Sequence, residues 1–179
     1  MKNLIINGGK KLHGEIQNQS SKNAAEAVLC ASLLVKGKVL LQDVPQIESV
    51  GRILDLLRSI GVKAEVNGNT VSLDTAGELN LKNLDKQAAE TTRASLLLFG
   101  ALAGRVKKYK LYKSGGCHLG ERTVRPHLFA LEKLGIEIEP KECYYDVRNT
   151  GVKKFSHIVL YESGDTTTEN VIMAAVLAQ

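Results

Sequence analysis

The sequence predicts an α/β protein built from a repeated unit, and two observations support this fold class. Three short segments are apolar around almost their whole circumference: 22–34, 92–103 and 169–178. A helix without a polar face has to be buried on every side. Matching Asn23, Arg93 and Asn170 places these segments 70 and 77 residues apart. The second observation is that an amphipathic helix ending at a glycine and followed by a strand occurs twice, around Gly61 and Gly135.

Within each unit the pattern predicts a buried helix, a strand, an amphipathic helix and two further strands. The hydroxyl clusters Ser20-Ser21, Thr91-Thr92 and Thr166–Thr168 stand before the three buried helices and suit N-capping. The first amphipathic helix has an apolar stripe made of Ile47, Val50, Ile53, Leu54, Leu57 and Ile60. Asn67-Gly68-Asn69 then predicts a tight turn between two strands.

The repeat also bears on the extent of the protein. Two units are complete, whereas the third ends after its first helix. Because repeated units bury their apolar faces against neighbours, we expect the chain to be the front part of a longer protein. The alternative is a natural two-unit domain with a C-terminal helix packed on it.

Composition excludes several classes of protein. The 179 residues are 44% hydrophobic and 24% charged, close to the globular average, so collagen-like, low-complexity and disordered chains are excluded. No apolar run reaches the length of a membrane span, and the first residues lack a signal peptide, so we expect a cytoplasmic protein without membrane partners. The net charge of +5 favours anionic partners.

Cysteine and lysine patterns indicate neither a metal site nor nucleic-acid binding. The three cysteines and four histidines lack the spacing of zinc ligands or of a disulfide framework, so no metal is expected. Cys30 lies in an apolar helix and is expected in the core. The lysine-rich segment 106–113 alternates with apolar residues, which is typical of an edge strand.

The segment Ser114-Gly-Gly-Cys-His-Leu-Gly-Glu-Arg122 is the strongest candidate for chemistry. Its glycines allow a tight turn whose backbone N–H groups face a bound anion. A thiol at Cys117, with His118 and Arg122 close in sequence, is a candidate reactive cysteine. An ordinary turn is the alternative interpretation of these residues.

This loop, the Lys22-Asn23 pair and Thr92-Arg93-Ala94-Ser95 together resemble the enolpyruvyl transferases, in the branch that acts on UDP-N-acetylglucosamine. Leu41–Pro45, Leu134-Gly135 and Thr168–Ala175 carry further motifs of that family, in order, over almost the whole chain. The resemblance implies an inside-out α/β barrel lobe of repeated βαβαββ units, with helices inside and sheets outside. It also implies transfer of an enolpyruvyl group from phosphoenolpyruvate to UDP-N-acetylglucosamine, the first committed step of peptidoglycan synthesis, with no cofactor.

The resemblance further divides the chain into segments. Residues 1–21 would be N-terminal strands that pack on a second, C-terminal lobe, which is missing here. Residues 22–179 would be the incomplete first lobe, with units at about 22–91, 92–167 and 168–179. The family's general-base aspartate and another arginine that binds phosphoenolpyruvate lie in the second lobe, so the 179-residue chain is expected to be inactive alone.

Site residues follow from the same resemblance. Cys117 would protonate the methylene carbon of phosphoenolpyruvate and react with the epoxide antibiotic fosfomycin. Lys22, Asn23 and Arg122 would bind phosphoenolpyruvate. The nucleotide sugar would be bound by Arg93, Arg122, Thr123, Val124, Arg125 and Pro126. The sequence departs from the family at Thr123 and Arg125, where the family has proline and aspartate. Position 125 thus has a base in place of an acid, so the contact of that residue with the nucleotide is the less certain part of the resemblance.

Other interpretations remain open for these residues and for the chain. Lys22 would otherwise be a solvated residue of a first helical turn, Arg93 a structural partner of Glu90, and His118 and His127 surface or helix-packing residues. For the chain, the alternatives are a non-catalytic or partner-dependent half-domain of the same fold and an enzyme acting on 3-phosphoshikimate. The cysteine loop argues against the latter, since that branch works without this thiol.

Overall fold

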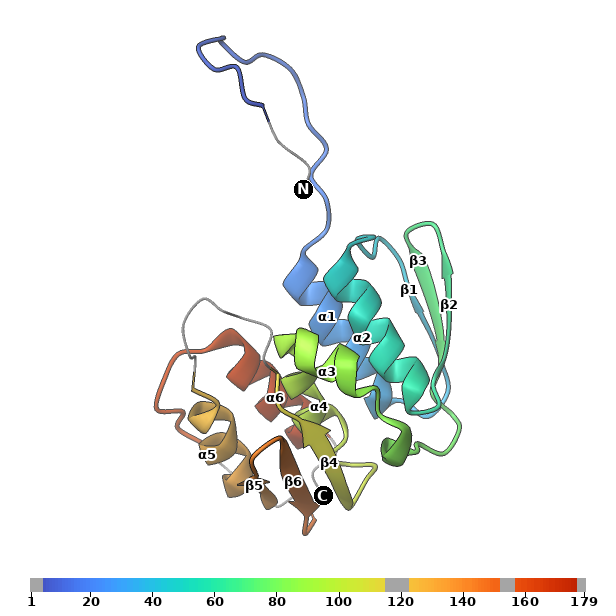
Figure 1. Ribbon diagram of the computed structural model, residues 1–179, viewed down its shortest axis with the longest axis vertical. Coiled ribbons are helices and arrows are strands. Elements are labelled where there is room, and N and C mark those ends of the chain that lie inside the picture. Colours follow the sequence, from blue (N-terminus) through green and yellow to red (C-terminus); the bar gives the residue numbers. More distant parts are fainter. Residues whose placement is uncertain (1–4, 115–122, 152–156, 177–179) are drawn as a thin grey trace.

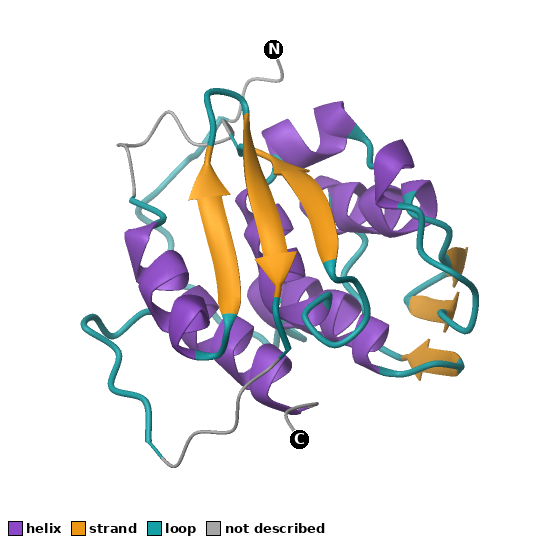
Figure 2. Ribbon diagram, turned by 90° about the horizontal axis from the view of Figure 1, so that it is seen from below, coloured by secondary structure: helices purple, strands orange, loops and turns teal. Residues whose placement is uncertain are grey.

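The computed structural model describes residues 5–114, 123–151 and 157–176. Two separate three-stranded sheets lie against a group of helices (Figure 1). The view from below shows the sheet nearest the viewer face-on, with helices behind it (Figure 2). This α/β arrangement is the predicted fold class. None of the described helices is long and apolar enough to cross a membrane.

The first unit forms in the predicted order. Its elements are α1 (Lys22–Ala31), the 3₁₀ turn η1 (Ser32–Leu34), β1 (Lys38–Leu41), α2 (Glu48–Ser59), β2 (Lys63–Asn67) and β3 (Thr70–Asp74). All strand pairs are antiparallel, and β3 lies between β1 and β2.

The second unit repeats this topology. A linking segment holds η2 (Leu81–Asn83) and α3 (Lys86–Thr91), and the unit itself holds η3 (Arg93–Leu97), α4 (Leu98–Ala101), β4 (Lys108–Tyr112), α5 (Arg125–Lys133), β5 (Ile136–Pro140) and β6 (Tyr144–Asn149). Its sheet order, β4-β6-β5, matches β1-β3-β2 strand for strand. The predicted repeat is therefore confirmed in two units. The helix α6 (Asp165–Val176) follows them, and its place as the first helix of a third unit stays a prediction.

Several local predictions are confirmed. The stripe of α2 is buried apart from Ile47, which is half-buried at the N-cap. Gly61 and Gly135 have φ of 105° and 84°, the left-handed conformation that glycine adopts without a Cβ clash. β4 is an edge strand in which Lys108 and Lys110 are exposed, whereas Tyr109 and Leu111 are buried.

The predicted burial of three apolar helices holds for one of them. Every residue from Thr92 to Ala103 is buried except Arg93, which is half-buried. For α1 the prediction is wrong, because Val28 is 47% exposed. In α6, Ile172 and Val176 are 57% and 61% exposed, which is the core surface that an incomplete third unit is expected to leave uncovered. Among the described residues nothing packs on that side of these two helices.

Two of the three predicted N-caps are also wrong. The Ser21 hydroxyl does accept a hydrogen bond from the Ala24 N–H, 3.3 Å away, at the start of α1. At Thr92 the side chain makes no such bond. The helix α6 begins at Asp165, so Thr166–Thr168 lie inside the helix near its start. Its first residue is three residues before the unit boundary predicted at 168.

Residues 5–20 form an arm without helix or strand that extends away from the helices (Figure 1). The strand that a βαβαββ unit places before its first helix is therefore not formed by these residues. Four large apolar side chains of the arm are almost fully exposed: Ile5, Ile6, Leu12 and Ile16. The docking of residues 1–21 on a second lobe stays a prediction.

A close backbone contact in the core joins α4 to α6. A Cβ built on Gly100 would lie 2.2 Å from the Asn170 carbonyl oxygen and 2.9 Å from its carbonyl carbon. The fully buried Asn170 side chain accepts the Gly100 N–H at 2.8 Å and donates to the Leu96 carbonyl at 2.9 Å. Glycine at position 100 thus allows a backbone-to-backbone approach that the Asn170 amide completes with hydrogen bonds.

This contact makes Gly100→Ala a test of the packing. Since the added methyl would overlap the backbone of α6 and cannot be relieved by a side-chain rotation, we expect a loss of about 3 kcal/mol in the free energy of unfolding. Chemical denaturation followed by circular dichroism measures the change.

Gly51→Ala is the matched control. Gly51 lies inside α2, and a Cβ there would meet nothing within 4 Å. We expect this variant to gain about 1 kcal/mol from the helix propensity of alanine. Equal stability of the two variants would contradict the proposed contact at Gly100.

Candidate functional site

The start of α1 presents Lys22 and Asn23 to solvent. The cap at Ser21 fixes the first turn, and both side chains are exposed. The Lys22 ammonium lies 3.8 Å from the Glu26 carboxylate, one turn along the helix. Glu26 itself is buried, with 7% exposure, so one end of this pair is held inside the protein. The unpaired N–H groups and the helix dipole favour anions at this end of α1.

Arg93 lies at the start of η3, the equivalent place in the second unit, and reaches the segment that precedes α5. Its guanidinium donates a hydrogen bond to the Thr123 carbonyl over 3.4 Å. The Thr123 hydroxyl in turn accepts the Arg125 N–H at 3.2 Å, and Val124 is the N-cap of α5. The structure therefore brings Arg93 together with part of the segment predicted to bind the same nucleotide sugar.

The side chains of that segment point in different directions. Thr123 and Arg125 are exposed, and Val124 is half-buried. Pro126 is buried in the first turn of α5, so its predicted contact with a nucleotide sugar depends on its backbone.

The helices that carry these groups are neighbours. α1 packs against η3, α4 and α6. Burial, then Asp165 and Glu26, raises the pKa of Glu169. Glu26 and Glu169 are each the fifth residue of their helix, so the amino-terminal halves of α1 and α6 lie on neighbouring helices of the same packed group.

Cys117 and Arg122 lie outside the described residues, as does His118. The segment that holds them joins Ser114, just after β4, to Thr123, whose carbonyl accepts the bond from Arg93. The roles predicted for Cys117 and Arg122 stay predictions. The other cysteines are Cys30, which is in the core as predicted, and Cys143, which is exposed.

His127, for which the sequence allows a surface or a helix-packing role, lies in the core with 2% exposure. Its Nδ1 lies 2.9 Å from the Asn170 amide nitrogen, and its Nε2 lies 3.5 Å from the Thr166 hydroxyl. Burial and then the Arg93 guanidinium lower the pKa of His127 to about 4, so the ring is neutral at pH 7. The signal was present in the sequence, because His127 shares a helical face with Ala130, Leu131 and Leu134.

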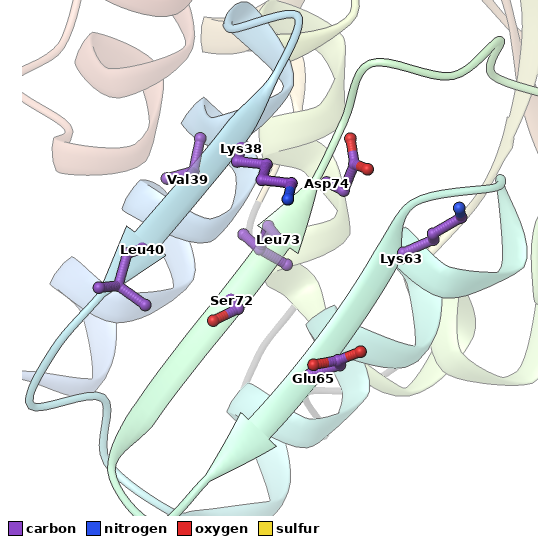
Figure 3. Close-up of a pocket in the computed structure, with 8 residues that line it drawn as sticks. All are labelled: Lys38, Val39, Leu40, Lys63, Glu65, Ser72, Leu73 and Asp74. Atoms are coloured by element: carbon purple, nitrogen blue, oxygen red, sulfur yellow. The ribbon is translucent and has the colours of Figure 1, made fainter.

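A pocket lies on the outer face of the first sheet (Figure 3). The register of the strands places Lys38, Asp74 and Lys63 in one row across the sheet. The next row on the same face holds Leu40, Ser72 and Glu65. None of the predicted catalytic or binding residues lines it. Within the described ranges, no three His, Cys, Asp or Glu side chains gather as metal ligands.

Comparisons with known proteins agree with this fold. The solved structures that resemble the chain include the enolpyruvyl transferase NikO from Streptomyces tendae and an EPSP synthase from Acinetobacter baumannii. The TM-scores are 0.66 and 0.69, at 18% and 15% sequence identity. The matches cover 81% and 93% of this chain, and 32% and 38% of those proteins. At such identities the likeness concerns the fold alone.

Curated relatives are more similar in sequence. The chain is 37% identical over all its 179 residues to the UDP-N-acetylglucosamine 1-carboxyvinyltransferase of Desulfatibacillum aliphaticivorans, and 35% identical to that of Cellvibrio japonicus. It spans 42% and 43% of their lengths, respectively. The family model described as EPSP synthase (3-phosphoshikimate 1-carboxyvinyltransferase) matches residues 6–179. With that match over nearly its whole length, the chain belongs to the EPSP synthase family of enolpyruvyl transferases.

Proposed function

We propose that the intact protein containing this chain transfers the enolpyruvyl group of phosphoenolpyruvate to UDP-N-acetylglucosamine, with release of phosphate. The observation that carries the proposal is the identity of 35–37% over the whole chain with proteins of that name. The proposed reaction supplies peptidoglycan synthesis and takes place in the cytoplasm. Because the chain spans about two fifths of those relatives, it would provide only part of the site.

The chemistry is an addition followed by an elimination. A sugar hydroxyl oxygen bonds to the carbon of phosphoenolpyruvate that carries the phosphate, while a proton is added to the methylene carbon. Loss of a proton from that carbon and departure of phosphate then restore the double bond. In this proposal Cys117 is the general acid of the first step, and the base that accepts the hydroxyl proton lies outside this chain.

Binding of the small acid would fall to Lys22, Asn23 and Arg122. Phosphoenolpyruvate carries both a phosphate and a carboxylate, and its reacting carbon becomes positive in the transition state. Fixed cations hold these anions in place beside that carbon. The exposed position of Lys22 at the start of α1, with its ammonium near Glu26, supports this role.

The nucleotide sugar would be bound by Arg93 with Arg122, Thr123, Val124, Arg125 and Pro126. The hydrogen bond from Arg93 to Thr123 supports a common site for these residues. The exposed Thr123 and Arg125 are available for polar contacts with a diphosphate. An arginine at 125 suits that anion better than the aspartate of the family pattern does.

The direct test is an assay of phosphate release by the intact protein with phosphoenolpyruvate and UDP-N-acetylglucosamine, and with 3-phosphoshikimate as the second acceptor. We expect turnover with the nucleotide sugar alone. Turnover with 3-phosphoshikimate in its place would move the protein to the other branch of the family, and turnover with neither acceptor would favour a non-catalytic protein.

Cys117→Ser tests the general acid. Since a hydroxyl is a much weaker acid than a thiol, we expect turnover of the intact protein to fall at least about 100-fold. Covalent labelling by fosfomycin, followed by mass spectrometry, should disappear in the same variant. Cys143→Ser is the matched control, because Cys143 is the exposed cysteine of the described chain, and it should retain both turnover and labelling. Unchanged labelling of Cys117→Ser would refute the assignment.

Lys22→Gln tests the anion contact at α1. Loss of a charge-assisted hydrogen bond should raise the KM for phosphoenolpyruvate at least about tenfold, or about 1.4 kcal/mol. Lys86→Gln removes a similar lysine–glutamate pair, 3.7 Å from Glu90 in α3, and should leave that KM unchanged. A parallel effect in both variants would indicate general destabilisation and contradict a binding role for Lys22.

A further inference from the structure

Asn170 joins three parts of the fold through one buried amide. Its oxygen accepts the Gly100 N–H of α4, and its nitrogen donates to the Leu96 carbonyl of η3. The second hydrogen of that nitrogen is directed to His127 Nδ1 of α5, 2.9 Å away. With 0% exposure, the amide has no access to water in place of these partners.

The amide nitrogen can only donate, so His127 Nδ1 has to accept. The neutral ring then carries its proton on Nε2, which faces the Thr166 hydroxyl of α6 at 3.5 Å. The opposite tautomer would place two N–H groups against each other in the core. The network therefore selects one tautomer of His127.

His127 also lies at the end of a chain of contacts that leads to the candidate site. Its backbone N–H donates to the Val124 carbonyl at 3.0 Å, which closes the first turn of α5. The preceding residue on that turn, Thr123, accepts the hydrogen bond from Arg93. The Asn170–His127 bond is thus the buried anchor of the turn that presents residues 123–126 beside Arg93.

We propose that His127 is a positioning residue: as the Nε2–H tautomer bonded to Asn170, it holds the 123–126 turn and Arg93 in the arrangement that binds the nucleotide sugar. The proposal rests on the proposed function for the identity of that ligand. His127 contacts neither substrate in this scheme and acts through the turn that it anchors.

The tautomer is tested without substrate. Nitrogen-15 NMR of the histidine side chains distinguishes a protonated ring nitrogen from an unprotonated one, and the signals lost in His127→Asn identify residue 127. We expect a neutral ring protonated at Nε2 at pH 7. A ring protonated at Nδ1, or at both nitrogens, would overturn the proposal.

Two substitutions distinguish the effect of losing the hydrogen bond to Asn170 from the effect of losing the imidazole ring. His127→Asn places an amide oxygen near the position of Nδ1 and can still accept from Asn170, whereas His127→Gln places its polar group near Nε2 and leaves the Asn170 hydrogen without a partner. In the intact protein we expect His127→Gln to raise the KM for UDP-N-acetylglucosamine at least about tenfold. The kcat and the KM for phosphoenolpyruvate should stay within about threefold, and His127→Asn should restore the KM to within about threefold of the original.

Thr75→Val controls for loss of stability alone. Thr75 is 1% exposed, and its hydroxyl bonds to Val35 and Gly37 in the first unit, so this variant removes a buried hydrogen-bonding group away from the 123–126 turn. We expect lower stability with an unchanged KM for the nucleotide sugar. Equal impairment of His127→Asn and His127→Gln, an unchanged KM in a folded His127→Gln, or a KM change in Thr75→Val that matches it would each overturn the proposal.

The two proposals fail in different ways. If the unmodified protein shows no turnover with the nucleotide sugar, the proposed function fails, and the NMR measurement still decides whether the Asn170–His127 bond exists. If turnover is present and His127→Gln behaves like the unmodified protein, the positioning role fails alone. Should His127→Gln not fold, the tautomer and the kinetics of His127→Asn decide the proposal: a KM raised more than threefold in His127→Asn would overturn it.

Discussion

The backbone contact between Gly100 and Asn170 is the constraint on which the rest of the core depends. At this distance α4 and α6 leave no room for a side chain, and the polar groups of both helices lose access to water. The Asn170 amide compensates by bonding to Gly100, Leu96 and His127 at the same time. Through His127 the contact extends to α5. The packing of α4 against α6 therefore also determines the position of the first turn of α5.

The repeated unit places chemically different groups at equivalent positions. Asn23 is exposed beside Lys22, Arg93 is half-buried and bonded to Thr123, and Asn170 is completely buried. Asn23 and Arg93 lie in the first turn of α1 and of η3, whereas Asn170 lies five residues after the start of α6. Equivalent positions of the repeat therefore differ in their place on the helix, and Asn170 stabilises the contact that holds α4 and α6 together.

Much of the fold could be predicted from the sequence because it depends on local rules. The apolar stripe of α2, the left-handed glycines at 61 and 135 and the alternation of β4 each reflect the periodicity or conformational freedom of a few neighbouring residues. The cysteine loop and its neighbours also indicated the family, which the comparisons show. The complete burial of α1 and two of the three caps were predicted incorrectly. Burial depends on which segments lie alongside a helix, and α6 begins one residue before its hydroxyl cluster.

The sequence by itself determined the units, their order and the residue types available for binding an anionic substrate. Only the tertiary structure decided which of these residues meet: that Arg93 reaches Thr123 across 30 positions, that Glu26 is buried in a helix packed on α6, and that His127 belongs to the core. Periodicity assigns a residue to the buried face of its own helix. Its hydrogen-bond partner, 43 residues away for His127 and Asn170, is set by how closely two helices approach.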